Sequence, residues 1–282
     1  MVSGTTQVLG VFGDPVAHSL SPRLHTWFAE SAGVDAVYVP FHVRPEGLER
    51  AVGGLTALAI RGVNLTIPHK ETVVPLVDEL EPAAEAIGAV NTIINDGDRL
   101  FGDNTDARGL LADLRSHFPT QGWESRPALI LGAGGAARAA VVALREAGLP
   151  AIWVANRTEA KARDLVAALC PDTGTSMDFS PESLADATAQ AGLIINTTSL
   201  GLKGEAIPGL DLSRAREGAA VYDLIYNPAQ TPLLSAARAR GLAASNGLGM
   251  LVRQGAVSFE LWTGHSPPVE PVIQKLAATF RD

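Results

Sequence analysis

Short apolar stretches alternate with segments of helical periodicity along most of the chain. The apolar stretches predict strands, because they are short, rich in branched aliphatic residues and bounded by turn residues. The predicted strands are Gln7–Phe12, Ala36–Phe41, Gly62–Leu65, Thr92–Asn95, Ala128–Leu131, Ile152–Ala155, Leu193–Asn196, Val221–Leu224 and Ala243–Ser245. Strands separated by helices form parallel sheets with crossover connections. The pattern therefore predicts an α/β fold.

Two changes in this pattern predict a division into two domains. Ser116–Pro127 carries two prolines, a glycine and polar residues before a new strand, as a connection outside a domain core does. After Asn246-Gly247, the segment Met250–Trp262 has the periodicity of a long helix. We expect one domain over residues 1–107, joined by C-terminal helices within 247–282, and a second domain over 108–246.

A glycine-rich turn follows the strand Ala128–Leu131. The turn reads G-x-G-x-x-A from Gly132 to Ala137, and a helix-compatible run follows it. This is the strand, turn and helix context of a Rossmann-type dinucleotide site. In such a site the second glycine lets the backbone approach a pyrophosphate, and the helix N-terminus supplies free N–H donors. A tight turn that binds nothing is the alternative.

The next strand indicates which dinucleotide is bound. An NAD site places an acidic residue at the end of this strand, but here the strand is followed by Asn156, Arg157 and Thr158. Arg157 suits a phosphate, and Lys161 adds a second positive charge. We therefore predict NADP. The alternative is a surface arginine beside a helix that Thr158 caps.

Three polar loops in the first domain follow predicted strands. The first contains Ser19 and Ser21, whose hydroxyls can donate to one carboxylate or polyol, although Ser21 before Pro22 also suits a helix N-cap. The second contains Asn64, Thr66 and Lys70. A lysine at a helix start gains nothing from the helix dipole, so it either faces solvent or is held for use. We leave the neighbouring His69 outside the site.

The third loop region brackets a predicted hairpin with its turn at Asn95-Asp96-Gly97. It contains Asn91 before the hairpin and Asp106 after it. We predict that Lys70 and Asp106 meet as a catalytic pair. The alternative is that Asp106 only starts the helix at Ala107.

Together these segments closely resemble the shikimate dehydrogenase family. The resemblance covers nearly the whole chain, and it lies in Gly13–His25, Asn64–Lys70, Gly88–Thr92, Gly102–Asp106, Gly132–Ala137, Asn156–Thr158, Asn196–Gly201, Tyr222–Pro228 with Thr231, and Gly247–Gly264. It implies two α/β domains, of which the first, with the C-terminal helices, binds shikimate or 3-dehydroshikimate and the middle one binds NADP.

The resemblance also implies roles for single residues. Lys70 and Asp106 match the catalytic pair, and Ser19 and Ser21 match the donors to the substrate carboxylate. The residues matched to the ring hydroxyls are Asn64, Thr66, Asn91, Tyr226 and Gln254. Those matched to the cofactor are Gly132, Ala133, Gly134, Gly135, Ala136, Asn156, Arg157, Thr158, Lys161, Leu224 and Gly247. The expected activity is reversible NADPH-dependent reduction of 3-dehydroshikimate to shikimate, in the shikimate pathway of aromatic amino-acid biosynthesis.

Composition and charge narrow the class of protein further. The 22 basic and 30 acidic residues give a net charge of −8, which argues against nucleic acid as a partner. All of that excess lies in residues 1–106, which hold 6 basic and 14 acidic side chains. The single Cys170 cannot form an intrachain disulfide, and the six histidines lack metal-ligand spacing. We expect no bound metal and no membrane span.

We therefore expect a cytoplasmic enzyme that acts on a small molecule, with a second copy of the chain as a candidate partner. Two alternatives stay open. One is a quinate/shikimate dehydrogenase of relaxed substrate or cofactor specificity, since a few pocket residues decide such preferences. The other is a non-catalytic NADP-binding sensor, which the presence of both Lys70 and Asp106 argues against.

Overall fold

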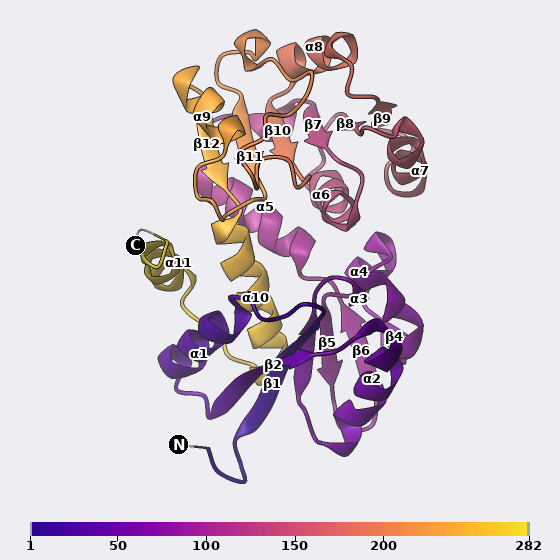
Figure 1. Ribbon diagram of the computed structural model, residues 1–282, viewed down its shortest axis with the longest axis vertical. Coiled ribbons are helices and arrows are strands. Elements are labelled where there is room, and N and C mark those ends of the chain that lie inside the picture. Colours follow the sequence, from indigo (N-terminus) through magenta and orange to yellow (C-terminus); the bar gives the residue numbers. More distant parts are fainter. Residues whose placement is uncertain (1, 281–282) are drawn as a thin grey trace. The chain divides into compact units, whose positions relative to one another are not determined.

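The protein is described from a computed structural model that covers residues 2–280 (Figure 1). The chain divides into two compact units. The first unit combines residues 1–109 with 252–282, and the second consists of residues 110–251. The predicted α/β class, with two domains and C-terminal helices that join the first of them, is confirmed.

The first unit contains a mixed sheet with the strand order β2-β1-β3-β5-β6-β4. Its strands are β1 (Gln7–Gly13), β2 (Ala36–His42), β3 (Gly62–Leu65), β4 (Glu79–Leu80), β5 (Thr92–Asn95) and β6 (Leu100–Asp103). β1 pairs in parallel with β2 and β3, but β5 runs antiparallel to both β3 and β6. The predicted hairpin around Asn95-Asp96-Gly97 is confirmed by the pairing of β5 with β6. The expectation of parallel pairing is wrong for β3 and β5.

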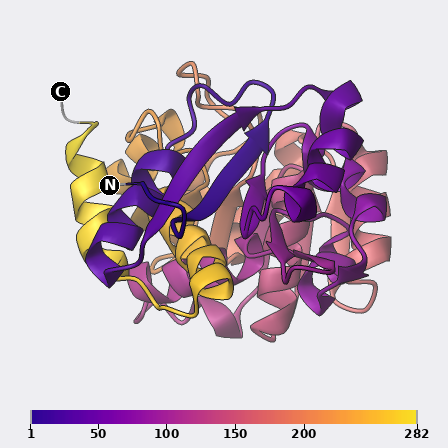
Figure 2. The same cartoon turned by 90° about the horizontal axis from the view of Figure 1, so that it is seen from below.

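Helices cover this sheet and complete the core of the first unit. They are α1 (Ser21–Ala32), α2 (Leu48–Ala57), α3 (His69–Thr72), α4 (Pro82–Ile87) and α11 (Val269–Ala278). Helices α1 and α11 pack side by side, as Figures 1 and 2 show. Short 3₁₀ turns, η1 (Pro45–Gly47) and η2 (Val74–Leu76), complete the unit's regular elements.

A tryptophan from the C-terminal stretch anchors that stretch to the first sheet. The indole Nε1 of Trp262 donates to the carbonyl of Ile93 in β5 at 2.9 Å, and the side chain is 1% exposed. Its ring lies so close to Gly62 in β3 that any side chain at position 62 would overlap it. Arg61 also donates, through Nε, to the carbonyl of Trp262 at 2.9 Å.

The second unit contains a parallel sheet with the strand order β12-β11-β10-β7-β8-β9. Its strands are β7 (Ala128–Leu131), β8 (Ile152–Ala155), β9 (Gly174–Met177), β10 (Leu193–Asn196), β11 (Ala220–Asp223) and β12 (Ala243–Asn246). In chain order within the unit, this is the doubly wound arrangement 3-2-1-4-5-6 of dinucleotide-binding domains. The predicted Rossmann-type sheet is confirmed.

Buried apolar strands explain why this sheet forms. Every residue of β7, β10 and β11 is buried, as expected for a parallel sheet covered on both faces. The covering helices are α6 (Gly135–Glu146), α7 (Glu159–Leu169), α8 (Pro181–Gln190) and α9 (Pro232–Ala239), with the 3₁₀ turns η3 (Trp123–Ser125) and η4 (Leu212–Arg214). The crossover between β10 and β11, which the structure describes in full, is irregular apart from η4.

Two helices contribute residues to both units and contact each other closely. They are α5 (Asp106–His117) and α10 (Leu248–Thr263). A Cβ atom at Gly109 of α5 would come within 2.8 Å of the backbone nitrogen of Gln254. At Gly249 of α10 it would overlap the buried carboxylate of Asp113. The two glycines therefore allow the close approach of these helices.

Candidate active site

The three polar loops of the first unit meet at one edge of its sheet. β1, β3 and β6 end at this edge, and the antiparallel strand β5 begins there, with Asn64 opposite Thr92 and Thr92 opposite Asp103. Ligands of open α/β sheets bind at the carboxyl ends of the strands. The loop positions are therefore those of a binding site.

Lys70 and Asp106 meet at this edge, as predicted. Lys70 Nζ lies 2.5 Å from Asp106 Oδ2, and the side chains are 33% and 13% exposed. Asp106 is the first residue of α5, and its backbone N–H donates to Asn104 Oδ1 at 3.0 Å. It therefore both starts the helix and pairs with the lysine, so the alternative that it only starts the helix is wrong.

Asn91 fixes the second oxygen of Asp106. Its amide nitrogen donates to Asp106 Oδ1 at 2.9 Å and to the Thr105 hydroxyl at 3.0 Å, and it lies 3.3 Å from Gln254 Oε1. Its amide oxygen accepts from the Thr105 backbone N–H at 2.9 Å. The carboxylate of Asp106 is thus held at both oxygens, facing the lysine through one of them.

Asn64 lies deeper in the same cluster and is 6% exposed. Its amide nitrogen faces three oxygen acceptors, each at 3.1 Å: the carbonyl of Asn91 and the hydroxyls of Thr92 and Ser258. Its amide oxygen accepts from the hydroxyl of Tyr38 at 2.8 Å. Tyr38, Thr92 and Ser258 were not among the predicted site residues; only Thr92, adjacent to Asn91, carried any sequence signal.

The structure contradicts one of the two interpretations of the first polar loop, which contains Ser19 and Ser21. Ser21 is the first residue of α1, the N-cap position is Leu20, and no side chain caps this helix. The interpretation of Ser21 as an N-cap is therefore wrong, and its hydroxyl does not serve the helix terminus. The Ser21 backbone N–H instead donates to the hydroxyl of Ser19 at 3.2 Å. Both serines are half-buried.

Two further side chains of the second polar loop, Thr66 and His69, follow β3. Thr66 follows β3, is half-buried, and donates its backbone N–H to the Phe12 carbonyl at 3.0 Å. His69, left outside the predicted site, is fully buried, with Nε2 2.7 Å from the carbonyl of Val43. That contact gives His69 a structural partner.

The glycine-rich turn of the second unit fits a dinucleotide. Gly132 has a φ of 111°, a left-handed conformation that glycine adopts without strain. Gly134 precedes α6 without any side-chain cap, and open space surrounds the Cβ positions of Gly134 and Gly135. The first N–H groups of α6 are thus accessible to a pyrophosphate. Ala133 and Ala136 are half-buried on either side, and the buried Ala137 packs the helix on the sheet.

Positively charged side chains follow β8, at the place where an NAD site has an acidic residue. Arg157 and Lys161 are exposed, while the amide nitrogen of Asn156 donates to the carbonyl of Thr158 at 2.8 Å. Thr158 stands at the N-cap position of α7, but its hydroxyl makes no capping hydrogen bond. The donors after β8 therefore suit a phosphate group, the feature that separates NADP from NAD.

The remaining predicted residues of the second unit follow β11 and β12. Gly247 packs against the backbone of Leu224 so closely that a Cβ atom would overlap the Leu224 carbonyl. Tyr226 is half-buried, and burial raises the pKa of its hydroxyl. Asp223, at the end of β11, accepts from the Thr231 hydroxyl at 2.6 Å and from the amide nitrogen of Asn196 at 2.9 Å. Burial raises the pKa of the Asp223 carboxyl.

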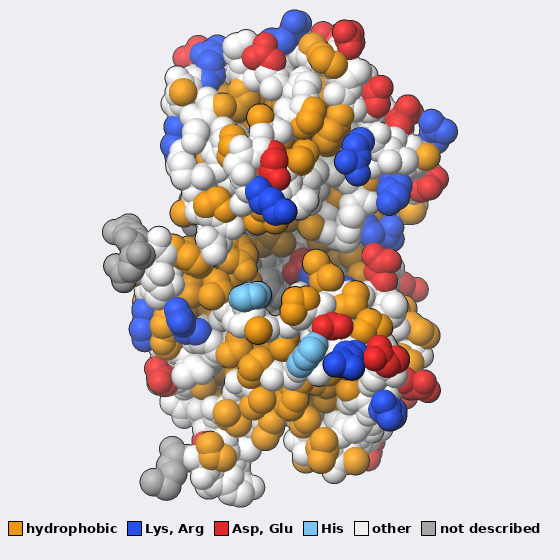
Figure 3. Space-filling model, viewed as in Figure 1, with side chains coloured by type: hydrophobic (Ala, Val, Ile, Leu, Met, Phe, Trp, Pro, Cys, Tyr) orange, Lys and Arg blue, Asp and Glu red, His pale blue; other side chains and the backbone are white. Residues whose placement is uncertain are grey.

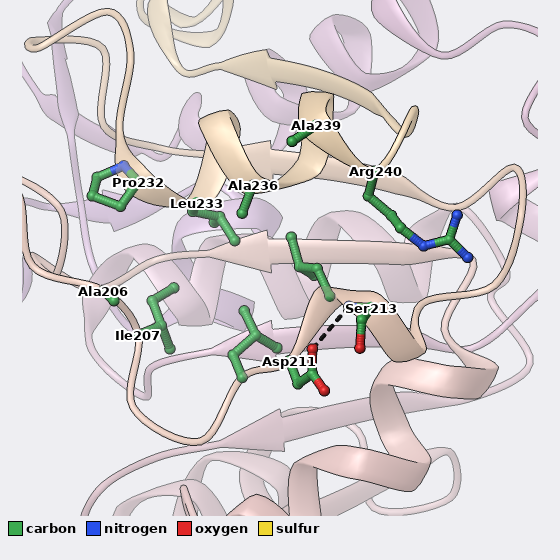
Figure 4. Close-up of a pocket in the computed structure, with 11 residues that line it drawn as sticks. Ala206, Ile207, Asp211, Ser213, Pro232, Leu233, Ala236, Ala239 and Arg240 are labelled. Atoms are coloured by element: carbon green, nitrogen blue, oxygen red, sulfur yellow. Dashed lines mark hydrogen bonds between the residues drawn. The ribbon is translucent and has the colours of Figure 1, made fainter.

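A hollow elsewhere on the second unit contains none of the predicted residues. It lies between α9 and the irregular crossover, has a volume of about 450 Å³, and is lined mainly by apolar side chains such as Ile207 and Leu233 (Figure 4). Its charged lining residues, Asp211 and Arg240, are exposed. Within residues 2–280 no cluster of acidic, histidine or cysteine side chains could hold a metal ion, and no helix is long and apolar enough to cross a bilayer.

Charged side chains of both signs are interspersed on the face shown in Figure 3. Among the large hydrophobic side chains exposed on the described part of the chain are Ile67, beside the Lys70 loop, at 75% and Leu202 at 50%.

Three family models match the chain. The shikimate dehydrogenase substrate binding domain matches residues 11–93, the shikimate / quinate 5-dehydrogenase model matches 115–201, and the shikimate 5'-dehydrogenase C-terminal domain matches 247–277. The three matches fall on both units.

Similar proteins extend the match to the full chain. The NADP(+) shikimate dehydrogenase of Rhodospirillum rubrum is 46% identical over 97% of this chain and 98% of its own. Shikimate 5-dehydrogenase from Thermus thermophilus, solved with NADP(H) and shikimate, is 39% identical with a TM-score of 0.85, covering 98% of this chain and 100% of its own. Quinate dehydrogenase from Corynebacterium glutamicum, solved with NAD, is 28% identical with a TM-score of 0.89, covering 97% and 99%.

Proposed function

The chain belongs to the shikimate dehydrogenase family, and we propose that it uses Lys70 and Asp106 as the acid–base pair of its reaction. That reaction is the reversible reduction of 3-dehydroshikimate to shikimate with NADPH, a step of aromatic amino-acid biosynthesis. The observation that carries the assignment is the 2.5 Å contact between Lys70 Nζ and Asp106, whose other oxygen Asn91 holds.

The pair supplies the proton of the reaction. NADPH, when bound, supplies a hydride to the ketone carbon of the substrate. The ammonium of Lys70 donates a proton to the ketone oxygen and stabilises the negative charge that develops on it. Asp106 orients the lysine through a charge-assisted hydrogen bond, and Asn91 prevents the carboxylate from turning away.

Donors around the pair hold the substrate in this proposal. Ser19 and Ser21 donate to its carboxylate, since two hydroxyls two residues apart can address one anion. Asn64, Thr66, Asn91 and Gln254 contact the ring hydroxyls. Tyr226, from the second unit, is assigned to the same ligand on the family resemblance.

The second unit holds NADP in the same proposal. The backbone from Gly132 to Ala136 approaches the pyrophosphate at the N-terminus of α6. Asn156, Arg157, Thr158 and Lys161 surround the 2′-phosphate. Leu224 and Gly247, which touch each other, border the nicotinamide.

Initial rates of nicotinamide reduction test this function. Shikimate and quinate are each combined with NADP and with NAD, and rapid turnover of shikimate with NADP alone is expected. Substantial turnover of quinate or NAD would favour the second candidate, a dehydrogenase of relaxed specificity, which the similarity to a quinate dehydrogenase supports. NADPH binding without turnover of any pair would indicate a sensor or another substrate.

Lys70→Ala tests the catalytic assignment directly. We expect kcat to fall by about 10²-fold or more while the Kd of NADPH stays within twofold, because the lysine acts mainly in the transition state. Lys275→Ala is the matched control: this lysine of the same unit lies over the ring of Trp27, 4.3 Å from its centroid, and its loss should leave kcat unchanged. A Lys70→Ala enzyme with normal kcat would remove Lys70 from the mechanism.

We further infer a cytoplasmic enzyme that acts on small molecules and has a second copy of the chain as its candidate partner. The single cysteine, which cannot form an intrachain disulfide, supports that compartment. Light scattering on the purified chain decides between a monomer and a homodimer.

A further inference from the structure

The side-chain amide of Asn64 is hydrogen-bonded at both of its ends. Its oxygen accepts from the Tyr38 hydroxyl at 2.8 Å, and its nitrogen faces the Asn91 carbonyl and the hydroxyls of Thr92 and Ser258 at 3.1 Å. The two ends of an amide have nearly the same shape, so its partners decide which end faces which way. The carbonyl of Asn91 can only accept, and this directs the Asn64 nitrogen toward it.

Tyr38 supplies the donor to the oxygen end of that amide. The tyrosine is 6% exposed, and it comes from β2, two strands away from β3 in the sheet. Burial raises the pKa of the Tyr38 hydroxyl, and the side chain of Ser21, the predicted donor to the substrate carboxylate, partly offsets that rise. Tyr38 is therefore bonded to one residue assigned to the substrate, Asn64, and influenced by a second.

The ring of Tyr38 is held by a parallel stack on His25. The two ring centroids are 4.2 Å apart and the planes differ by 2°. His25 is 1% exposed and lies among Phe28, Phe259 and Trp262. Burial lowers the pKa of His25 to about 3, so its imidazole is neutral in the folded protein. The aromatic cluster thus fixes the place from which the Tyr38 hydroxyl donates.

From Asn64 a hydrogen-bond chain reaches the catalytic pair. The Asn64 nitrogen contacts the Thr92 hydroxyl, which donates to the amide oxygen of Asn91 at 2.8 Å. The Asn91 nitrogen donates to Asp106, which pairs with Lys70. Every member between Tyr38 and Asp106 is buried.

We propose that Tyr38 is a positioning residue of this dehydrogenase, whose hydroxyl fixes the amide of Asn64 with its nitrogen toward the Asn91, Thr92 and Ser258 cluster. The proposal rests on the proposed function, in which Asn64 and Asn91 contact the substrate. Tyr38 touches no reacting atom; it acts through Asn64. Without the hydroxyl, the buried Asn64 oxygen loses its donor, and the amide is held only at its nitrogen end.

Tyr38→Phe removes this hydroxyl and keeps the stacked ring. We expect the KM for shikimate to rise by about tenfold, because the buried amide oxygen of Asn64 is left without its donor. The KM for NADP should stay within twofold. Tyr222→Phe is the matched control, because Tyr222 is fully buried in the second unit and donates to Asp113 at 2.6 Å. That control loses a comparable hydrogen bond, so its Tm falls too, but its KM for shikimate should not change.

A double-mutant cycle with Asn64→Ala tests whether Tyr38 acts through Asn64. In the Asn64→Ala background, adding Tyr38→Phe should leave the shikimate KM within twofold of the single variant. A tenfold effect in both backgrounds, or none in the wild-type background, would overturn the proposal. A wild-type chain that turns over no shikimate contradicts the proposed function itself, so the two failures are distinguishable.

Discussion

At the scale of single residues, the groups that donate hydrogen bonds in the candidate site are themselves held by others. Lys70 and Asp106 were predicted from polar loops beside predicted strands, and the family resemblance added Asn91, because residues in such loops have a recognisable context. Tyr38 and Ser258 were not, since an isolated buried hydroxyl on a strand or helix looks like any core position. They lie 26 and 194 residues away in sequence from Asn64, a separation that no local pattern encodes.

Arg157 decides cofactor preference if it binds the 2′-phosphate. Arg157→Ala should raise the KM for NADP by about tenfold or more and leave the KM for NAD nearly unchanged, since only NADP carries that phosphate. Arg163→Ala controls for the loss of a positive charge, because Arg163 lies on the following helix and pairs with Glu159 at 3.0 Å. Equal losses for both cofactors would contradict the assignment.

His25 makes stability depend on pH. Its pKa is about 3 when folded, against an ordinary value of 6.5, so between these values the unfolded chain binds a proton that the folded chain does not. The contribution of His25 to the free energy of unfolding is complete above pH 6.5. It is lost as the pH falls toward 3, by up to about 1.4 kcal/mol per pH unit.

Urea unfolding of the wild type and of His25→Phe between about pH 7 and about pH 4 measures this effect. The free energy of unfolding of the wild type should fall more steeply, because phenylalanine keeps an aromatic ring at this position and cannot take up a proton. Parallel pH profiles for the two proteins would show that His25 is protonated without cost to the fold.

At the scale of elements, nine strands were expected at positions close to those observed, because each is a compact apolar run. Three observed strands were not among them. β9 was missed because Gly174–Met177 is only half-buried at a sheet edge and lacks such a run, and β4 because it has only two residues. β6 was implied only as the second arm of the predicted hairpin. The pairing of β5 with β6 is the hairpin that the turn Asn95-Asp96-Gly97 predicted. The expected parallel pairing failed between β3 and β5, which run antiparallel although helices separate them in the chain.

Helix contacts predict opposite effects of the same substitution. Gly249→Ala should reduce the free energy of unfolding by about 1–3 kcal/mol, because the added methyl group overlaps the buried Asp113 carboxylate. Gly53→Ala in α2 should increase it by about 0.5–1 kcal/mol, since the space around Gly53 is open and alanine favours helix. Chemical denaturation of both variants provides the comparison, and equal effects would exclude the steric explanation.

At the scale of the whole molecule, each unit carries one of the two groups of predicted residues, apart from Tyr226. The first unit holds the Lys70 and Asp106 edge, and the second holds the glycine-rich turn and Arg157. The sequence predicted this grouping because ligand-binding loops of α/β sheets follow the carboxyl ends of strands, and most of these strands were recognisable as apolar runs.

Hydrogen exchange with each ligand alone tests that grouping. NADP should slow exchange mainly in Gly132–Ala137 and Asn156–Lys161, whereas shikimate should slow it mainly in Ser19–Ser21, Asn64–Lys70 and around Asn91, since a bound ligand stabilises the backbone that it contacts. Protection by shikimate confined to residues 110–251 would contradict the assignment of the substrate to the first unit.

The anchoring of Trp262 on β3 and β5 has a consequence for how the chain matures on the ribosome. Residues 1–109 emerge first, but the indole that bonds to Ile93 and covers Gly62 emerges only after the whole of residues 110–251. Domains fold as their residues leave the ribosome, so the second unit, made of one uninterrupted stretch, is complete first. The unit that begins translation is therefore the last to finish folding.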